Sequence, residues 1–264
     1  MQTRTYADLY DLIQALCGVT FATIEEARIR ALVNRRASKA YKASNYWTRF
    51  IAIGEERSLF STAITASTSI ISGTRYIIRS VGDSNFTSIG AESNTVGVVF
   101  VASGVGSGTG TVSAYLGYIP YSESPKKDVD AFLRIFSSKP YSTTTYGEYQ
   151  FTVDQNGASI SAGTLAPTSA FVTYKAQLQD RYGSAAGFTS TIPAEWFEYL
   201  AHGTYADYLR AEGQQEKAAL ADQEANEILL DELMKLDEQH TQTIISNRIS
   251  TNSNMQYRSM GYGS

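Results

Sequence analysis

The stretch from Pro193 to Gln239 constrains this chain most, because its many polar residues and narrow apolar seam suit a surface helix. Proline is favourable in the first turn of a helix. Gly203 and Gly213 predict interruptions, so we expect one helix at Ala194–His202 and a longer one at Tyr205–Gln239. The seam follows positions at three- and four-residue spacing along the longer helix: Ala218, Ala221, Ala225, Ile228, Leu229, Glu232 or Leu233, and Leu236. So narrow and alanine-rich a seam predicts close packing against another helix.

The tail from Thr241 to Ser264 contains no Asp, Glu or Pro, and its only charges are Arg248 and Arg258. A segment with so little apolar surface cannot fold alone, although it can order against a partner. We therefore expect residues 251–264 to form an extended C-terminal arm, with a plain disordered terminus as the alternative. The side chains that such an arm offers for docking are Met255, Tyr257, Arg258, Met260 and Tyr262.

Two further helices are predicted near the N-terminus. Thr5 or Asp8 caps the first helix, and Gly18 ends it. Thr23 and Glu26 form the capping-box pattern that opens the second helix. Together with the C-terminal stretch, these segments predict a helical bundle built from both ends of the chain.

The predicted helices differ in charge. Residues 24–49 hold seven Lys or Arg against two Glu, a net charge of +5, whereas residues 205–239 hold ten acids against three bases, a net charge of −7. The two segments either pair, within one chain or across a subunit boundary, or form separately solvated faces whose ion pairs are worth little. The candidates for inter-helix or inter-subunit charge contacts are Arg28, Arg35, Arg36, Lys39, Glu224, Glu227, Asp231 and Glu232.

The middle of the chain is rich in Val, Ile, Thr and Gly, which predicts short strands. Residues 50–65 suit a strand, a bend and a second strand, and the frequent turn signals in 70–116 indicate a small barrel or sandwich. Asn156-Gly157 predicts a β-hairpin. We expect one or two helical turns at 128–136 and an extended segment at 171–179 that finishes as a helix.

Composition limits the class of protein. The length of 264 residues suggests roughly two domains. The 18 Tyr against 2 Trp suit either interfaces or half-buried strand positions. A net charge of −4 gives no overall attraction for nucleic acid. The single cysteine, Cys17, allows no internal disulfide and is expected to be a small core residue. Without a long apolar run we expect neither a signal peptide nor a membrane span, and assembly in a cytoplasm.

No residue pattern predicts catalysis. His202 and His240 have no Cys or His at metal-ligand spacing and suit helix ends. The glycine-rich run Gly104 to Gly110 lacks the Gly-Lys-Ser/Thr and the following helix of a phosphate loop, so we expect a flexible hairpin or a strand-edge loop. The C-terminal acids lie on a solvated helix rather than in an apolar pocket. The sequence therefore predicts a protein that is not an enzyme, with no catalytic residue, cofactor or metal.

Most of the chain nevertheless consists of segments whose sequences resemble those of known proteins. The longest segments are TIPAEWFEYLAHGTYADYLRAEGQQEKA and YADLYDLIQALCGVTFATIEEARIRALVNRRASKAYKAS, and shorter ones are IAIGEERSLF, YIPYSESPKKDVDAFLRIFSSKPY and GEYQFTVDQNGASI. These segments resemble the head-to-tail adaptor, or connector, proteins of the neck of tailed bacteriophages, which dock on the portal ring. A further segment, TRYIIRSVGDSNFTSIGAESNTVGVVFVASGVGSGTGTVSAYLG, resembles a small glycine-rich β module that recurs in otherwise unrelated phage virion proteins.

The resemblance implies an α+β fold. Its adaptor body comprises residues 1–65 and 115–250, a helical bundle formed by the N- and C-terminal segments plus a β-sheet part. The glycine-rich all-β module at 66–114 is an insertion in a surface loop, where long insertions are tolerated. The arm at 251–264 follows the body.

The resemblance also implies a structural protein of the virion, assembled in the host cytoplasm. Such adaptors form a homo-oligomeric ring, usually a dodecamer, between the portal protein and a downstream tail or nozzle protein. DNA passes through during packaging and ejection without specific binding, since tight phosphate contacts would resist sliding. Two alternatives stay open: a decoration or tail protein whose β module binds a host-surface glycan, and an enzyme acting on cell wall or nucleic acid.

Overall fold

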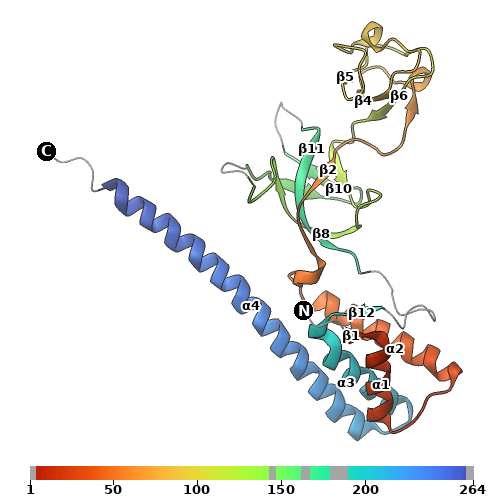
Figure 1. The fold of residues 1–264 in the computed structure, drawn as a ribbon, viewed down its shortest axis with the longest axis vertical. Coiled ribbons are helices and arrows are strands. Elements are labelled where there is room, and N and C mark those ends of the chain that lie inside the picture. Colours follow the sequence, from red (N-terminus) through yellow and green to blue (C-terminus); the bar gives the residue numbers. More distant parts are fainter. Residues whose placement is uncertain (1–3, 143–146, 162–166, 179–189, 260–264) are drawn as a thin grey trace. The chain divides into compact units, whose positions relative to one another are not determined.

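The computed structural model describes residues 4–142, 147–161, 167–178 and 190–259. The chain divides into two compact units, one of residues 1–49 and 178–264 and the other of residues 50–177. The long helices belong to the first unit and most strands to the second, so the predicted α+β class is confirmed (Figure 1).

The first unit, here called the helical unit, contains four helices and a two-stranded sheet in its described part. The helices are α1 (Tyr6–Cys17), α2 (Thr23–Ala43), α3 (Ala194–Ala211) and α4 (Gln215–Ser259). The strands β1 (Arg4–Thr5) and β12 (Thr191–Ile192) pair antiparallel and so join the two chain segments of the unit. A 3-10 helix, η1 (Thr48–Phe50), leads out of the unit.

The start and end of α1 are as predicted. The Thr5 hydroxyl accepts from the Asp8 backbone N–H, and the Asp8 carboxylate accepts from the Thr5 backbone N–H. Gly18 ends the helix with a left-handed φ of 68°. Helix α2 begins one residue earlier than the predicted capping box requires. Its N-cap is Ala22, whose N–H donates to the Glu25 carboxylate at 3.1 Å.

The predicted break at Gly203 is wrong, because α3 runs through it and ends at Ala211. The chain turns instead at Gly213, whose φ of 80° is left-handed. His202 consequently lies inside α3 rather than at a helix end, and its Nδ1 is 3.2 Å from the Glu224 carboxylate on α4.

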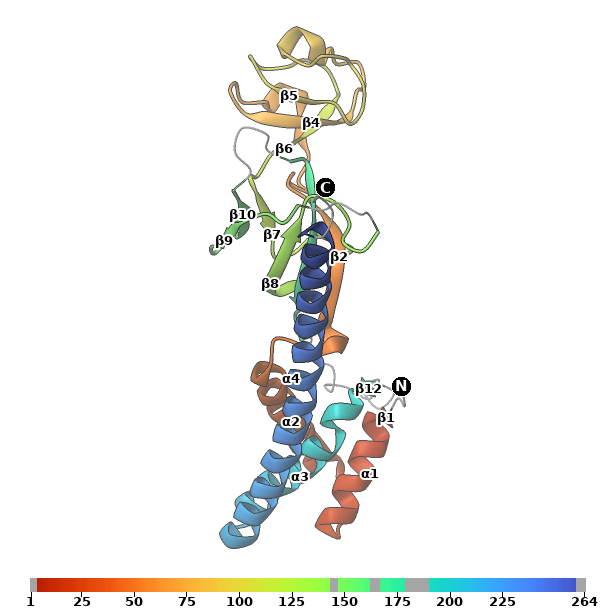
Figure 2. The ribbon, with the colours of Figure 1, turned by 90° about the vertical axis from the view of Figure 1, so that its left-hand side faces the viewer.

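The core of the helical unit lies between α3 and its neighbours. Figures 1 and 2 show α4 running along α3, and the buried residues of α4 form the predicted alanine-rich seam: Ala218, Ala221, Ala225 and Leu229. Trp47 and Trp196 pack edge to face with ring centroids 5.5 Å apart. The small alanine side chains let α4 approach α3 closely, as the sequence indicated.

Helix α4 is longer than predicted. It continues past Gln239 to Ser259, beyond the ends of the three other helices (Figure 1). The part of the predicted arm that the structure describes, residues 251–259, is therefore helical rather than extended, and His240 is not at a helix end. Residues 214–260 contain neither proline nor glycine, which is compatible with this continuation of the helix.

The second unit contains three antiparallel sheets in its described part. The first has the order β2 (Ile51–Ser58), β11 (Ser169–Ala176), β8 (Val129–Phe136). The second has the order β7 (Tyr118–Pro120), β10 (Gly157–Ile160), β9 (Phe151–Val153). Asn156-Gly157 joins β9 to β10, which confirms the predicted hairpin. Both sheets share a core with Ile119, Ile135 and Tyr174.

The helical turns predicted at 128–136 are wrong, because this segment is strand β8. Its buried residues are Val129, Phe132, Ile135 and Phe136, which is a helical spacing. Irregularities in the register with β11 allow this spacing within a strand, since each bulge shifts the alternation by one residue. Strand β11 likewise continues to Ala176, where a helical ending was expected.

The third sheet has the order β3 (Thr65–Ala66), β6 (Thr111–Ala114), β4 (Arg75–Ser80), β5 (Val99–Val101), and two 3-10 helices, η2 (Ser67–Ser69) and η3 (Phe86–Ile89), accompany it. It has a core of its own, formed by Ile70, Tyr76, Ile78, Phe86, Ile89, Ala91, Phe100, Ala102 and Val112. Thr65 pairs with Val112, and Ser61 N–H donates to the Ala114 carbonyl at 2.8 Å. The two ends of the 66–114 segment therefore lie side by side.

Hydrogen bonds hold the glycine-rich run in place. Ser67 donates to the Gly108 carbonyl at 2.7 Å, and the Gly110 N–H donates to Ser84 Oγ at 2.7 Å. Asp83 accepts from the side chain and backbone of Thr109, and these bonds lower the pKa of Asp83. The run is thus a loop hydrogen-bonded to its own sheet, and strand β6 follows it where a phosphate loop would have a helix.

Candidate functional site

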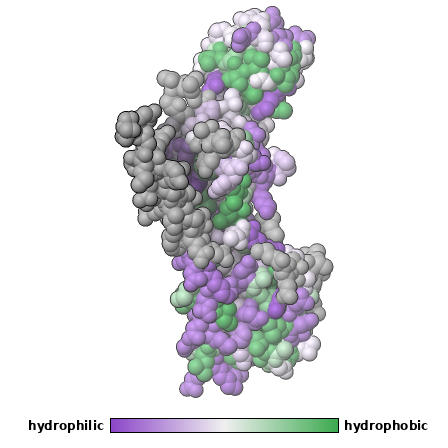
Figure 3. All heavy atoms as spheres, turned by 60° about the vertical axis from the view of Figure 1, so that its left-hand side comes forward, coloured by the Kyte–Doolittle hydropathy of each residue, from purple (hydrophilic) through white to green (hydrophobic). Residues whose placement is uncertain are grey.

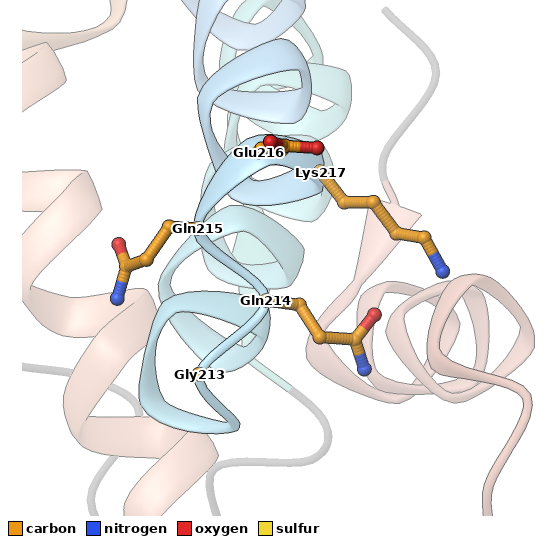
Figure 4. A pocket seen from close by; sticks show the side chains of 5 residues that line it. All are labelled: Gly213, Gln214, Gln215, Glu216 and Lys217. Atoms are coloured by element: carbon orange, nitrogen blue, oxygen red, sulfur yellow. The ribbon is translucent and has the colours of Figure 1, made fainter.

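Two hollows in the described surface are the first places to look for a ligand. One, of about 450 Å³, lies at the turn between α3 and α4 and is lined by Gly213, Gln214, Gln215, Glu216 and Lys217. Figure 4 shows that these side chains point in different directions instead of converging on one point. The other, of about 560 Å³, is lined by residues 148–151 beside β9. Neither presents the convergent polar groups by which a small-molecule site fixes its ligand.

Across the described ranges, no group of three or more His, Cys, Asp or Glu residues is arranged to hold a metal ion. No helix in the part of the chain that the structure describes is long and apolar enough to cross a membrane. The candidate functional residues are instead the charged residues of the helical unit.

A buried ion network joins three helices. Arg36 on α2 donates from Nε and Nη2 to the two carboxylate oxygens of Asp207 on α3, both at 2.8 Å, and its Nη1 lies 2.7 Å from Asp222 Oδ1 on α4. Arg36 and Asp207 are each only 4% exposed. Arg210 adds a further contact to Asp207 at 2.9 Å and to Asp222 at 3.5 Å. A two-pronged guanidinium contact of this kind fixes geometry as well as charge.

The protonation of the network follows from its contacts. Burial lowers the pKa of Arg36, but the hydrogen bonds and charges of the two carboxylates raise it more, so it is above its usual value. Burial raises the pKa of Asp222, but the hydrogen bond and charge of Arg36 lower it more, so it is below its usual value. Arg36 and Asp222 are therefore charged at neutral pH, and the contacts of Arg36 connect α2 to both α3 and α4.

Gly203 explains how Arg36 reaches its partners. A Cβ atom at Gly203 would lie 3.1 Å from Arg36 Cδ and 3.2 Å from its Nε. The glycine therefore leaves a passage along α3 for the arginine stem. Asp207 stands four residues later, on the same face of the helix. A residue that looked like a helix break serves to bring a buried cation against its carboxylate.

The face of α2 turned to solvent carries a row of bases, which we call the basic stripe: Arg28, Arg35, Lys39 and Lys42. These residues recur every three, four or seven positions, so they share one helix face, with exposed Ala31 among them. Arg28 makes a half-exposed contact to Glu212 at 3.7 Å, and Arg35, 70% exposed, lies 3.7 Å from Asp207. Within the described chain, Lys39 and Lys42 form no ion pair.

The face of α4 opposite its buried seam combines acids with apolar side chains, and we call it the acidic–apolar stripe: Glu216, Leu220, Gln223, Glu227, Leu230, Asp231, Met234 and Glu238. Its apolar members, Leu220, Leu230 and Met234, are 69%, 53% and 62% exposed. Positions 216, 220, 223, 227, 230 and 234 alternate four- and three-residue steps, the spacing of a helix–helix seam. Figure 3 shows one face of the molecule, on which hydrophilic residues of the helical unit surround smaller apolar areas.

The charge candidates chosen from the sequence have separate places in the structure. Of the bases, Arg36 is buried in the network, whereas Arg28, Arg35 and Lys39 lie on the basic stripe. The chosen acids contact none of them in the described chain. Glu224 lies against His202, Glu232 against Lys235, and Glu227 accepts from Gln223.

The acids that do meet α2 are Asp207, Asp222 and Glu212, which sequence reasoning missed. The sequence does contain an indication for Asp207: it is an acid among apolar neighbours, on a helix face that also holds Gly203. Such a position favours a buried, paired carboxylate over a solvated one.

The docking residues proposed for the arm lie in the last ten residues of the chain. Met255, Tyr257 and Arg258 are on the distal part of α4, in a stretch whose side chains are not described. Met260 and Tyr262 lie outside the described residues.

Comparison with models of known protein families finds no match to this chain. Comparison with curated proteins finds none either.

Proposed function

We propose that this chain is a virion structural protein, a head-to-tail adaptor that forms a ring between the portal and the tail of a bacteriophage. The proposal rests first on the resemblance of its helical and β segments to neck proteins. In this role the ring stands at the neck of the virion and lines the DNA passage, with the portal protein on one side and a tail or nozzle protein on the other. No specific grip on DNA is required of it.

The observation that carries the proposal is the outward face of α4. The helix packs on α3 through Leu229, and from Leu230 to Glu238 none of its side chains is buried. About 45 Å of helix lies beyond Leu229, since α4 reaches Ser259 at 1.5 Å per residue. A helix that exposes leucine and methionine along its length favours contact with a protein partner over free exposure to water.

The structure of the 66–114 segment supports the proposal that it is an inserted module rather than a part of the adaptor body. Its ends are adjacent, and its core draws on its own residues. A segment with adjoining ends can be added to a loop at small cost in chain entropy. Its removal, with Thr65 joined to Tyr115, should therefore leave the remainder of the chain able to assemble.

The direct test uses purified full-length protein and portal rings of the same phage. We expect the chain to cosediment with portal rings and to be visible as an added ring by electron microscopy. Removal of residues 250–264 should lower the amount retained on the portal. A protein that stays monomeric and ignores portal rings, with or without residues 250–264, rejects the proposal.

A second candidate function is supported by the exposed apolar side chains of the β module, Ile71, Val96, Val101 and Val105. These form potential contact surface on a segment that stands apart in sequence from the helical unit. In this function the module binds a host-surface glycan and the protein decorates the particle. Deletion of residues 66–114 discriminates the two: loss of adsorption with intact assembly assigns host binding to the module, whereas unchanged adsorption removes this candidate.

A further inference from the structure

We infer that the acidic–apolar stripe of α4 in one copy of this chain packs against the basic stripe of α2 in the next copy. The inference deepens the ring assembly proposed above and rests on it. It names the two surfaces that meet and the charges that align them.

The two stripes are complementary in charge. The basic stripe holds four cations, at positions 28, 35, 39 and 42, and no acid. The acidic–apolar stripe holds four anions, at positions 216, 227, 231 and 238, and no base. In the described chain none of these four anions takes part in an ion pair. Complementary fields across an interface favour correct partners and exclude like-charged surfaces.

The two stripes also match in length and shape. Residues 28–42 span about 21 Å of helix, and residues 216–238 span about 33 Å, so the second covers the first completely. Exposed Ala31 on α2 leaves room for a larger side chain between its basic neighbours. The apolar side chains Leu220, Leu230 and Met234 are the residues that gain from removal from water.

The pairing cannot occur within one chain, because each stripe faces away from the core of the unit. On α2 the inward face is Ile29, Val33, Ala37 and Ala40, and on α4 it is the alanine seam that packs on α3. Two different surfaces of one chain that bind each other join copies head to tail, and such contacts close into a ring when the rotation permits. A second copy is therefore the occupant that these faces fit.

The test reverses the charge of each stripe in full-length protein. One variant carries Lys39→Glu and Lys42→Glu on α2, and the other carries Glu227→Lys and Asp231→Lys on α4. Neither pair forms an ion pair with the buried network, although the charge of Lys39 helps to lower the pKa of Asp222, so the stability of the α2 variant has to be measured as well. We expect each variant to associate about 10- to 100-fold more weakly than wild type by sedimentation velocity or mass photometry, since attraction becomes repulsion at two positions.

The decisive measurement is a mixture of the two variants. In the mixture, each reversed stripe finds a reversed partner on the other variant, so assembly should return, with the two chains alternating. A chain that carries all four substitutions should also assemble with itself. The control is Lys139→Glu with Lys217→Glu, which alters net charge as much as the α2 variant does but lies off both stripes, and it should assemble as wild type does. Melting curves for each variant confirm that the fold is intact.

Several outcomes overturn the inference. Wild-type assembly in both variants shows that the stripes are not in contact, and dissociation that the mixture does not repair shows that they are not each other's partners. An α2 variant that assembles normally but loses retention on duplex DNA assigns the basic stripe to nucleic acid. A wild-type chain that is monomeric alone and on portal rings overturns both inference and proposed function, whereas rescue by mixing without portal binding rejects only the proposed function.

Discussion

Replacement of Arg36 by methionine is the sharpest test of how the helical unit is held together. Methionine keeps the length and much of the volume of the arginine stem but removes the charge and all three contacts to Asp207 and Asp222, at 2.7–2.8 Å. Asp207, 4% exposed, keeps only Arg210 at 2.9 Å and the long contact to Arg35 at 3.7 Å. The variant thus leaves a buried carboxylate with two of its three arginine partners and without the closest two of its four contacts.

The expected loss follows from the burial. Removal of one partner of a buried ion pair costs about 3–5 kcal/mol, because the remaining charge stays desolvated. Arg210 is 41% exposed and compensates in part, so we expect the lower end, about 3 kcal/mol in the free energy of unfolding. Arg28→Met is the matched control: it breaks a contact at 3.7 Å between two half-exposed groups, which is worth about 0–1 kcal/mol.

Tryptophan fluorescence isolates the unit in which the change occurs. The chain has two tryptophans, Trp47 and Trp196, and both are buried in the helical unit. Urea titrations followed by this signal should show Arg36→Met well below wild type and Arg28→Met close to it. The double variant Arg36→Met/Asp207→Leu should recover part of the loss, since it removes the orphaned charge. If Arg36→Met is no more destabilising than Arg28→Met, the network does not hold the helices together.

Three further predictions concern single residues. The pKa of Asp222 is lower in the folded protein than in the unfolded chain, where it is about 4. The stability that Asp222 contributes is therefore present above the unfolded pKa and is lost as the pH falls through the folded pKa. In Asp222→Asn the midpoint of urea unfolding should depend less on pH in that range. Burial raises the pKa of Cys17 to about 11; its alkylation at pH 8 should be about 100-fold slower than that of an ordinary thiol and should become fast in urea. Gly157→Ala places a Cβ 1.9 Å from the Ile119 carbonyl oxygen. It should lower the free energy of unfolding of the 50–177 unit by more than about 2 kcal/mol, measured by far-UV circular dichroism. The control Gly73→Ala, with open space around the new Cβ, should cost about 1 kcal/mol.

The features that could be read from the sequence are those decided by neighbours along the chain. Thr5 with Asp8 caps α1, Gly18 ends it, and Asn156-Gly157 turns the hairpin, because each depends on contacts within four residues. The alanine seam of α4 was also predictable, since a single helix face determines it.

The features that could not be read depend on distant partners. Gly203 interrupts a helix in isolation, but packing of Arg36 against it, 167 positions earlier in the chain, keeps α3 continuous. Residues 128–136 have helical spacing of apolar residues, and only the bulged pairing with β11 makes them a strand. The buried role of Asp207 could not be read from the sequence for the same reason, since its partner Arg36 lies 171 positions earlier in the chain. Charge counts reveal that two segments attract, but not which acid faces inward.

The buried network and the outward stripes are linked by the geometry of α2. One of its arginines, Arg36, points into the unit, and this anchor sets the rotation of the helix about its axis. That rotation is what places positions 28, 35, 39 and 42 together on the outer face. The interior contact thereby sets the surface that we propose for assembly, and Arg35, 3.7 Å from Asp207, is the stripe residue that also reaches the network. It follows that Arg36→Met should weaken association between copies as well as folding, in protein that is still mostly folded, while Arg28→Ala should weaken association alone.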